Sequence, residues 1–246
     1  MKRSIQLFVF TTVASAAFGG AFTVCSTGFA VASTSGCGAA ITSPAANTLS
    51  ADGNWYVASN SSGTFLSQAF VTINNSFPVG PTNPGSNPWL ANDANSSWIT
   101  PTNNQATTYP NAQYFYGTNF SLTSGQATSA QITGSWLADD YGTGIFLNGV
   151  GVGQSSLPAF GGLGGPLVFF SISNGGVGQA QFQINNNSLV FGLANDSTNH
   201  GLLAGGNTPT GLRVQISATA VPEPGTILLM GAGLAGVLVA RRRRSA

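Results

Sequence analysis

The stretch Ile145-Phe146-Leu147-Asn148-Gly149-Val150-Gly151-Val152 decides the fold class of this chain. Two short apolar runs flank the central pair Asn148-Gly149. A two-residue hairpin turn of type I′ needs a positive φ at both central positions, which asparagine and glycine adopt most readily. The stretch therefore predicts a β-hairpin.

Similar patterns extend from about Ala51 to Ala220. Short apolar or alternating runs are separated by Gly, Asn, Ser and Pro, with no convincing helical period, which is typical of an all-β protein. We expect one β-sandwich or jelly-roll ectodomain over residues 33–220, because a segment of this length suits a single domain. The predicted strands are Asn54 to Ala58, Gln68 to Ile73, Gln113 to Leu122, Ala130 to Leu137, Gly144 to Leu147, Leu167 to Ile172, Ala180 to Ile184, Ser188 to Leu193 and Gly211 to Ala218.

Charged residues lie mainly at the two ends of the chain. Between positions 4 and 240 the only cation is Arg213, although the whole chain has 7 basic residues. Nucleic-acid binding requires clustered basic side chains, so we expect no nucleic-acid partner for the ectodomain. The apolar content of 42% is sufficient to bury a core and argues against disorder.

The amino terminus predicts a secretory signal peptide over residues 1–32. Lys2 and Arg3 precede an uncharged stretch in which an apolar run is followed by small residues, the order expected of such a signal. Two small-x-small cleavage sites are present, Ala14-Ser15-Ala16 and Ala30-Val31-Ala32. The later site sets the boundary given above, although the sequence leaves the choice open. A retained amino-terminal membrane helix is the alternative.

The choice of cleavage site controls the cysteine chemistry. A cut after Ala16 leaves both Cys25 and Cys37, which could pair in an oxidising compartment, whereas a cut after Ala32 leaves Cys37 alone. A zinc site needs about four ligands, and the chain has only 2 cysteines and 1 histidine. We therefore expect no metal site from these residues, whichever cleavage site is used.

The carboxy-terminal tail, residues 221–246, has three successive parts. Pro222, Glu223 and Pro224 come first, and the prolines keep the backbone extended and accessible to a processing enzyme. Residues 227–240 predict an apolar helix of roughly 21 Å, shorter than a hydrocarbon core of about 30 Å, which suits transient holding in a membrane. A basic run follows and predicts a cytoplasmic carboxy terminus by the positive-inside rule. It consists of Arg241, Arg242, Arg243 and Arg244.

This tail resembles the PEP-CTERM sorting signal. In that family a Pro-Glu-Pro motif, a short apolar helix and a basic end are recognised by an exosortase, which cleaves the signal during export. Pro222, Glu223 and Pro224 match the motif residue by residue. Because the family is typical of Gram-negative bacteria that make exopolysaccharide, the resemblance implies an exosortase partner, transient anchoring in the inner membrane, and final placement at the cell surface or in the extracellular polysaccharide.

A second stretch resembles galactose-binding-like jelly rolls. In those domains an acidic corner precedes a strand that ends in Asn-Gly, as Asp139 and Asp140 precede Asn148-Gly149 here. The resemblance implies a β-sandwich and suggests sugar binding. The candidate ligand-binding residues are Trp89, Trp98, Asp139, Asp140 and Asn148.

Each of these candidates has a structural alternative. Trp89 lies in the Pro/Asn-rich stretch Pro78 to Pro101, which could present it on a loop, and Trp98 lies in the same stretch. Core packing is the more common role of a tryptophan. Asp139 and Asp140 could help to ligate a structural calcium ion, or they could cap a turn. The sequence leaves these alternatives open.

Catalysis has little support in the sequence. The only histidine, His200, lies near Asp196 in a loop-like stretch, and no nucleophile can be assigned to it. We expect a protein that is not an enzyme and has no cofactor, namely an exported surface or matrix protein associated with exopolysaccharide. The alternatives are a dedicated carbohydrate-binding module that uses loop aromatics and a secreted hydrolase.

Overall fold

The computed structural model describes most of the ectodomain and part of the tail. The described residues are 22–30, 36–41, 49–72, 90, 92–104, 109–152, 167–174, 182–195, 207–208, 210–220, 231–237 and 241. Several predicted features lie outside them, namely residues 1–21 of the expected signal peptide, Trp89, His200, the motif Pro222 to Pro224, and Arg242 to Arg244.

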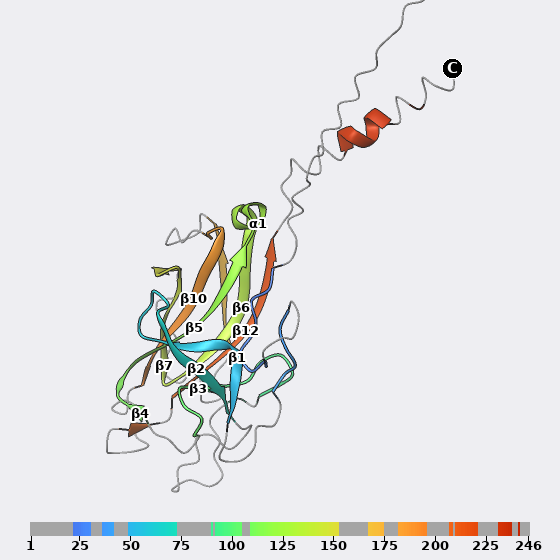
Figure 1. The fold of residues 1–246 in the computed structure, drawn as a ribbon. Helices are drawn as coiled ribbons and strands as arrows, with labels where there is room; N and C mark the ends of the chain where they lie inside the picture. Colours follow the sequence, from blue (N-terminus) through green and yellow to red (C-terminus); the bar gives the residue numbers. More distant parts are fainter. Residues whose placement is uncertain are drawn as a thin grey trace, which may run out of the picture.

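Ten strands form one antiparallel sheet, which confirms the all-β fold class (Figure 1). Their order in the sheet is β8-β7-β10-β5-β1-β2-β3-β12-β6-β9. The strands are β1 (Ser50–Ala58), β2 (Phe65–Val71), β3 (Ile99–Thr100), β5 (Ala112–Leu122), β6 (Ala130–Asp139), β7 (Tyr141–Leu147), β8 (Val150–Gly151), β9 (Val168–Ser173), β10 (Asn185–Asn195) and β12 (Gly211–Ala220). A separate two-stranded pair consists of β4 (Tyr109–Pro110) and β11 (Asn207–Thr208).

The sheet folds back on itself around a single main core. β6 and β10 are separated by several strands in the sheet, yet the ring centroids of Trp136 in β6 and Phe191 in β10 are 5.2 Å apart. Phe170 in β9 and Trp55 in β1 also contact Phe191, with centroids at 5.5 Å and 5.7 Å. We call strands β8, β7, β10, β5, β1 and β2 the first half and strands β12, β6 and β9 the second half. Side chains from both halves pack together in this core.

The predicted hairpin is confirmed. Leu147 of β7 pairs with Val150 of β8, and the turn residues Asn148 and Gly149 have φ values of 52° and 81°. These are the positive dihedral angles that a type I′ turn requires. Local turn chemistry therefore sets this part of the fold.

The other predicted strands all overlap strands of the structure, with one exception. The described part of the stretch Ala180 to Ile184 is not a strand. The backbone N–H of Phe182 donates to the side-chain amide oxygen of Asn174, and that of Gln183 donates to the amide oxygen of Asn187. Side-chain acceptors thus use the donors that a strand ladder would need.

A short helix, α1 (Ser124–Ser129), was not expected from the sequence. It begins with a capping box, in which the Thr123 hydroxyl accepts a hydrogen bond from the backbone N–H of Gln126 and the Gln126 side chain accepts one from the backbone N–H of Thr123. The spacing Thr123-x-x-Gln126 is the sequence signature of such a capping box and could have indicated the start of this helix. The helix connects β5 to β6 and brings Ala127 into the core.

Residues 22–30 also belong to the folded domain, although the expected boundary at Ser33 excludes them. Phe22 and Val24 are part of the core, and a disulfide bond joins Cys25 to Cys37. The tail has a different character, because residues 231–237 are helical and exposed to solvent. Among the described residues, no helix has the length and apolar content needed to cross a membrane.

Candidate functional site

Trp98 has a packing position in the structure. Its side chain is only 2% exposed, its indole N–H donates to the Leu90 carbonyl oxygen at 2.8 Å, and its ring packs with Leu137 in a small second core. A sugar ring needs an accessible aromatic face, which Trp98 does not offer. The structure therefore supports the packing alternative for this residue.

Asp139 and Asp140 lie at the junction of four strands and are each 6% exposed. The Thr210 hydroxyl donates to the Asp139 carbonyl oxygen at 3.0 Å, and the Asp140 N–H donates to the Ala194 carbonyl oxygen at 3.2 Å. These bonds connect the β6–β7 corner to β10 and to the start of β12. In the described parts of the chain, no three His, Cys, Asp or Glu side chains are grouped closely enough to hold a metal ion.

Asn148 connects the hairpin turn to β10. Its side-chain amide donates to the Asn187 amide oxygen at 3.0 Å and accepts from the Ser188 backbone N–H at 2.9 Å. The side chain that makes the turn possible also holds the turn against the neighbouring strand. Sequence reasoning placed Asn148 at a ligand site, whereas these contacts give it a role within the fold.

A different set of side chains lies on the outward face of the first half. Four partly exposed aromatic residues form what we call the aromatic strip. The rings of Tyr56 and Phe65 stack with centroids 5.4 Å apart and planes at 22°, and those of Phe115 and Phe146 meet edge to face at 6.3 Å. The members are Tyr56, Phe65, Phe115 and Phe146.

Cross-strand register brings the strip together. Tyr56 lies opposite Gly117, Gly117 lies opposite Val190, and Val190 lies opposite Phe146, so this row crosses β1, β5, β10 and β7. Successive residues of a strand point to opposite faces, and Trp55, which precedes Tyr56, is fully buried in the core. The row therefore lies on the face of the sheet that points away from Trp55 and the main core, and within it Val190 is itself fully buried.

Two glycines hold the rings close to the sheet. A Cβ atom at Gly117 would lie 2.6 Å from a ring carbon of Phe65, and one at Gly192 would lie 3.2 Å from a ring carbon of Phe115. The two rings therefore lie across backbone that has no side chain. This arrangement keeps the rings in place and leaves part of each one accessible to solvent.

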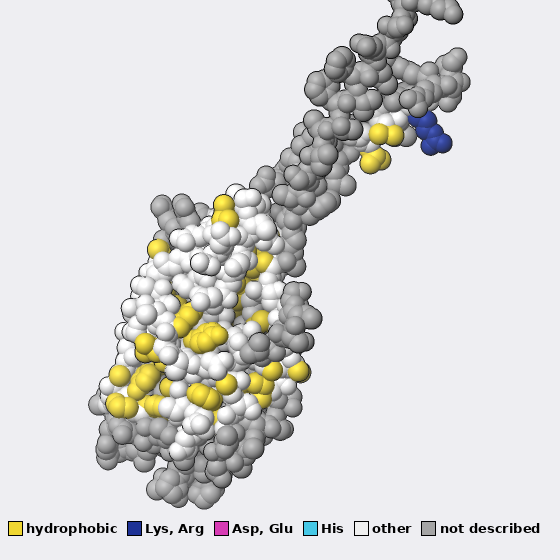
Figure 2. All heavy atoms as spheres, viewed as in Figure 1, with side chains coloured by type: hydrophobic (Ala, Val, Ile, Leu, Met, Phe, Trp, Pro, Cys, Tyr) yellow, Lys and Arg dark blue, Asp and Glu magenta, His cyan; other side chains and the backbone are white. Residues whose placement is uncertain are grey.

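The surface around the strip carries very little charge. Arg213 is 2% exposed and its guanidinium lies 2.6 Å from a carboxylate oxygen of Asp93, while Asp52, Asp139 and Asp140 are buried. Figure 2 shows hydrophobic side chains across the face in view and no charged side chain among the described residues of the domain on that face. A neutral partner that binds to this face would not have to remove water from a charged side chain of the described residues.

The tail follows directly from the last strand of the domain, because β12 ends at Ala220. A family model described as the PEP-CTERM protein-sorting motif matches residues 220–244. The chain carries a PEP-CTERM sorting motif. The match includes Pro222, Glu223, Pro224 and the basic run, so the resemblance drawn from these residues is confirmed.

The PEP-CTERM motif indicates how the protein is sorted. It is the signal of an exosortase substrate, and it implies export to the extracellular side with a membrane-anchored stage in transit. Among proteins of curated function, none is similar in sequence to this chain. The jelly-roll resemblance is not confirmed and stays a prediction.

The aromatic strip was missed by sequence reasoning for an identifiable reason. Its members were placed in or beside predicted strands, but which face they occupy depends on the register of β1, β5, β10 and β7. The available signal was the alternation Phe115-Tyr116-Gly117 and Val190-Phe191-Gly192, in which outward glycines alternate with inward aromatic residues. A glycine in a strand often marks a place where another group approaches the backbone.

Proposed function

We propose that this protein is a non-enzymatic component of the extracellular polysaccharide layer and that its aromatic strip binds neutral polysaccharide. The PEP-CTERM motif delivers the domain to the outside of the cell. The observation that carries the proposal is the strip itself, in which the Phe65 and Phe115 rings lie across Gly117 and Gly192 on an uncharged face. The proposal assigns a binding role to the domain and no catalytic residue.

The chemistry of the strip suits sugar rings. An aromatic face carries negative charge density, so it attracts the weakly positive C–H groups on the apolar face of a pyranose. Neighbouring strands are about 4.8 Å apart, so the row from β1 to β7 is roughly 14 Å long, enough for a short run of sugar residues. Each ring contact contributes about 1 kcal/mol, so a single site is weak.

A polymer compensates for weak individual contacts. A long polysaccharide offers many equivalent segments, and several protein molecules on one chain or layer raise the effective concentration of binding sites. Weak, repeated binding of this kind suits a matrix component better than a scavenger of free sugars. The alternative of a dedicated module that uses loop aromatics now depends on Trp89, which lies outside the described residues.

The binding proposal can be tested by affinity electrophoresis of the released protein through gels that contain a neutral polysaccharide, such as hydroxyethyl cellulose, or an anionic one, such as alginate. We expect retardation by the neutral polymer and a loss of affinity of about tenfold or more in the double variant Phe65→Ala/Phe115→Ala. Phe169→Ala is the matched control, because Phe169 is 73% exposed but lies on β9 in the second half.

Two outcomes would contradict the proposal. One is the absence of retardation by every neutral polymer, including the exopolysaccharide of the native host. The other is an equal effect of the strip variant and the Phe169 control. Circular dichroism and a melting curve on each variant separate lost binding from lost folding.

Exosortase processing has its own test. Intact-mass spectrometry of the protein from the native host should show a mature species without Arg241 and the residues after it. A substitution such as Glu223→Ala should leave the tail attached and the protein in the membrane fraction. A mature extracellular species that keeps the arginines would contradict processing at this motif.

A further inference from the structure

The amino-terminal part of the described chain is built into the β-domain. We call residues 22–30 and 36–41, which the Cys25–Cys37 bond joins, the disulfide clasp. Phe22 stacks on Phe120 with ring centroids 5.6 Å apart and meets the edge of Phe182 at 6.5 Å. The clasp therefore supplies part of the core and does not simply cover it.

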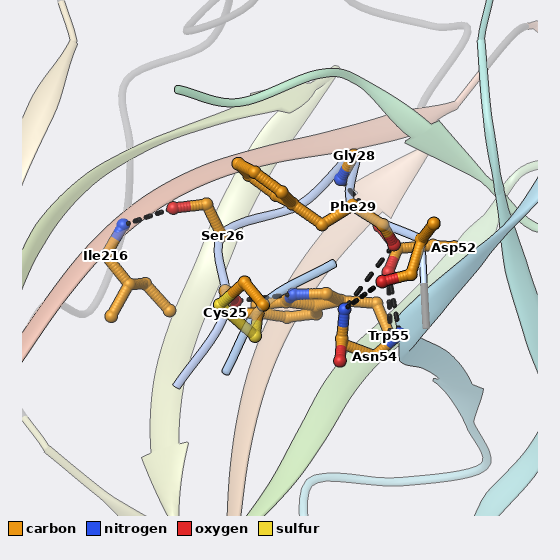
Figure 3. The surroundings of a disulfide bond; sticks show 10 residues. Cys25, Ser26, Gly28, Phe29, Asp52, Asn54, Trp55 and Ile216 are labelled. Carbon is orange, nitrogen blue, oxygen red and sulfur yellow. Dashed lines mark hydrogen bonds between the residues drawn. A yellow bond between two sulfur atoms is a disulfide. The ribbon is translucent and has the colours of Figure 1, made fainter. Parts of the chain in front are cut away.

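The clasp is also hydrogen-bonded to β12 and to Ser97, which lies just before β3. The backbone N–H of Thr27 donates to the Val214 carbonyl oxygen at 3.0 Å, and the Thr27 hydroxyl donates to the Ser97 carbonyl oxygen at 2.6 Å. The Ser97 N–H donates in return to the Thr27 carbonyl oxygen at 2.9 Å. The Ser26 hydroxyl accepts from the Ile216 N–H at 3.0 Å (Figure 3).

A third set of bonds joins the clasp to β1 (Figure 3). The buried carboxylate of Asp52 accepts from the backbone N–H of Gly28 at 2.6 Å. The indole N–H of Trp55, whose side chain is fully buried, donates to the Cys25 carbonyl oxygen at 2.9 Å. Both are interior polar groups, so each needs its partner within the protein.

A cleavage after Ala32 would remove residues 22–30. The core would lose the Phe22 ring, the Trp55 indole would lose its acceptor, and Cys37 would lose its disulfide partner. The result would be a cavity and unsatisfied buried polar groups in one place, a combination that destabilises proteins strongly. The fold therefore requires the clasp to remain in the exported protein.

We propose that the signal peptide is removed by hydrolysis of the Ala16–Ala17 peptide bond, so that the exported protein begins at Ala17 and keeps the whole clasp. Ala14 and Ala16 supply the small residues that leader cleavage requires at the third and first positions before the bond. Water adds across the bond, leaving a carboxylate on Ala16 and an amine on Ala17. The Cys25–Cys37 bond belongs to an oxidising compartment, in agreement with export. This inference does not depend on polysaccharide binding.

The test uses the full chain expressed in its native host, with two matched variants. Ala16→Glu and Ala32→Glu each place a large charged residue at the first position before one of the two candidate bonds. We expect amino-terminal sequencing of the exported wild-type protein and of Ala32→Glu to begin at Ala17. Ala16→Glu should accumulate as a precursor that begins at Met1.

A wild-type start at Ser33, or a block by Ala32→Glu together with normal processing of Ala16→Glu, would overturn the proposal. A start between Phe18 and Phe22 would overturn the assignment to the Ala16–Ala17 bond. Alkylation of the denatured protein gives an independent readout. We expect no adduct before reduction and two after it, whereas a single adduct before reduction, the mark of Cys37 without Cys25, would contradict the proposal.

Discussion

The backbone N–H of Gly28 donates a hydrogen bond of 2.6 Å to the buried carboxylate of Asp52. Gly28 has a φ of 94°, and a Cβ at this position would lie 2.5 Å from the Cβ of Ser97, so only glycine fits. Asp52 also accepts from the backbone N–H groups of Asn54 and Trp55. One carboxylate thus ties the disulfide clasp to the first long strand of the domain.

Asp52 should give the protein a distinctive pH dependence. Burial raises the pKa of Asp52 to about 6 from an ordinary value of 3.8, although its backbone N–H donors oppose the shift. The folded state then binds this proton more tightly than the unfolded state does. The resulting stabilisation is fully present below about pH 4, is lost as the pH rises through about 6, and is on the order of 3 kcal/mol.

Urea unfolding at a series of pH values measures this effect. The free energy of unfolding of the wild type minus that of Asp52→Asn should fall between about pH 4 and pH 6 and then level off, because the amide does not titrate in this range. The subtraction removes the contributions of the other carboxylates. A difference that is flat, or that rises with pH, would show that burial does not control this group.

The disulfide should contribute measurably to stability. The two cysteines are 12 residues apart, and a crosslink that closes a loop of about this length stabilises a protein by about 3 kcal/mol in the chain-entropy model. We expect Cys25→Ser/Cys37→Ser to have a clearly lower Tm than the wild type. A reducing agent should lower the wild-type Tm toward that of the variant and leave the variant unchanged. Equal melting temperatures would contradict the structural role of the clasp.

Gly134 should tolerate no side chain. A Cβ there would lie 2.1 Å from the Gln215 carbonyl oxygen, which belongs to the paired strand β12 and cannot move without breaking the ladder. We expect Gly134→Ala to lower the free energy of unfolding by about 2 to 3 kcal/mol or to prevent folding. Gly151→Ala is the control, because its nearest neighbour atom would be 3.9 Å away. Similar urea midpoints for the two variants would contradict this prediction.

The Asp93–Arg213 pair should matter more than an ordinary surface ion pair. Arg213 is buried, its guanidinium also donates to the Ser96 hydroxyl at 2.8 Å, and Asp93 accepts from the backbone N–H of Asn95. Burial alone would raise the pKa of Asp93, but the Asn95 bond and the Arg213 charge outweigh it and lower the pKa. The Asp93 contribution is therefore present above the ordinary pKa of 3.8 and is lost as the pH falls through the lowered value.

We expect Asp93→Asn to cost about 1 to 2 kcal/mol near neutral pH, since it removes a charge-assisted hydrogen bond to a buried cation but keeps the shape of the side chain. The loss should shrink in acid, where the wild-type carboxylate is itself protonated. Thermal unfolding at neutral and acidic pH measures both effects. A cost that grows in acid would show that the ion pair is not the source of the stabilisation.

Local features of the fold were predictable from the sequence. The Asn148-Gly149 hairpin and most strands follow from turn chemistry and alternation within a few residues, and the structure places them as expected. The prediction of a strand at Ala180 to Ile184 was wrong. The backbone N–H groups of Phe182 and Gln183 donate to the side chains of Asn174 and Asn187, which lie outside this stretch. The candidate ligand residues were less predictable, because exposure depends on packing partners that are distant along the chain. Trp98 shows this, since Leu137 helps to cover it.

The sequence by itself determined the all-β class, the hairpin and the sorting tail, because each is encoded by residues that are close together along the chain and is recognised without a folded partner. Only the tertiary structure decided that Cys25 pairs with Cys37, that Phe22 belongs to the core, and that four aromatic residues share one face, where Phe65 lies over Gly117 and Phe115 over Gly192. These features require strands and segments that are far apart in the sequence to meet in one register. A shift of a single residue in that register would turn the strip inward, and no local pattern records the choice.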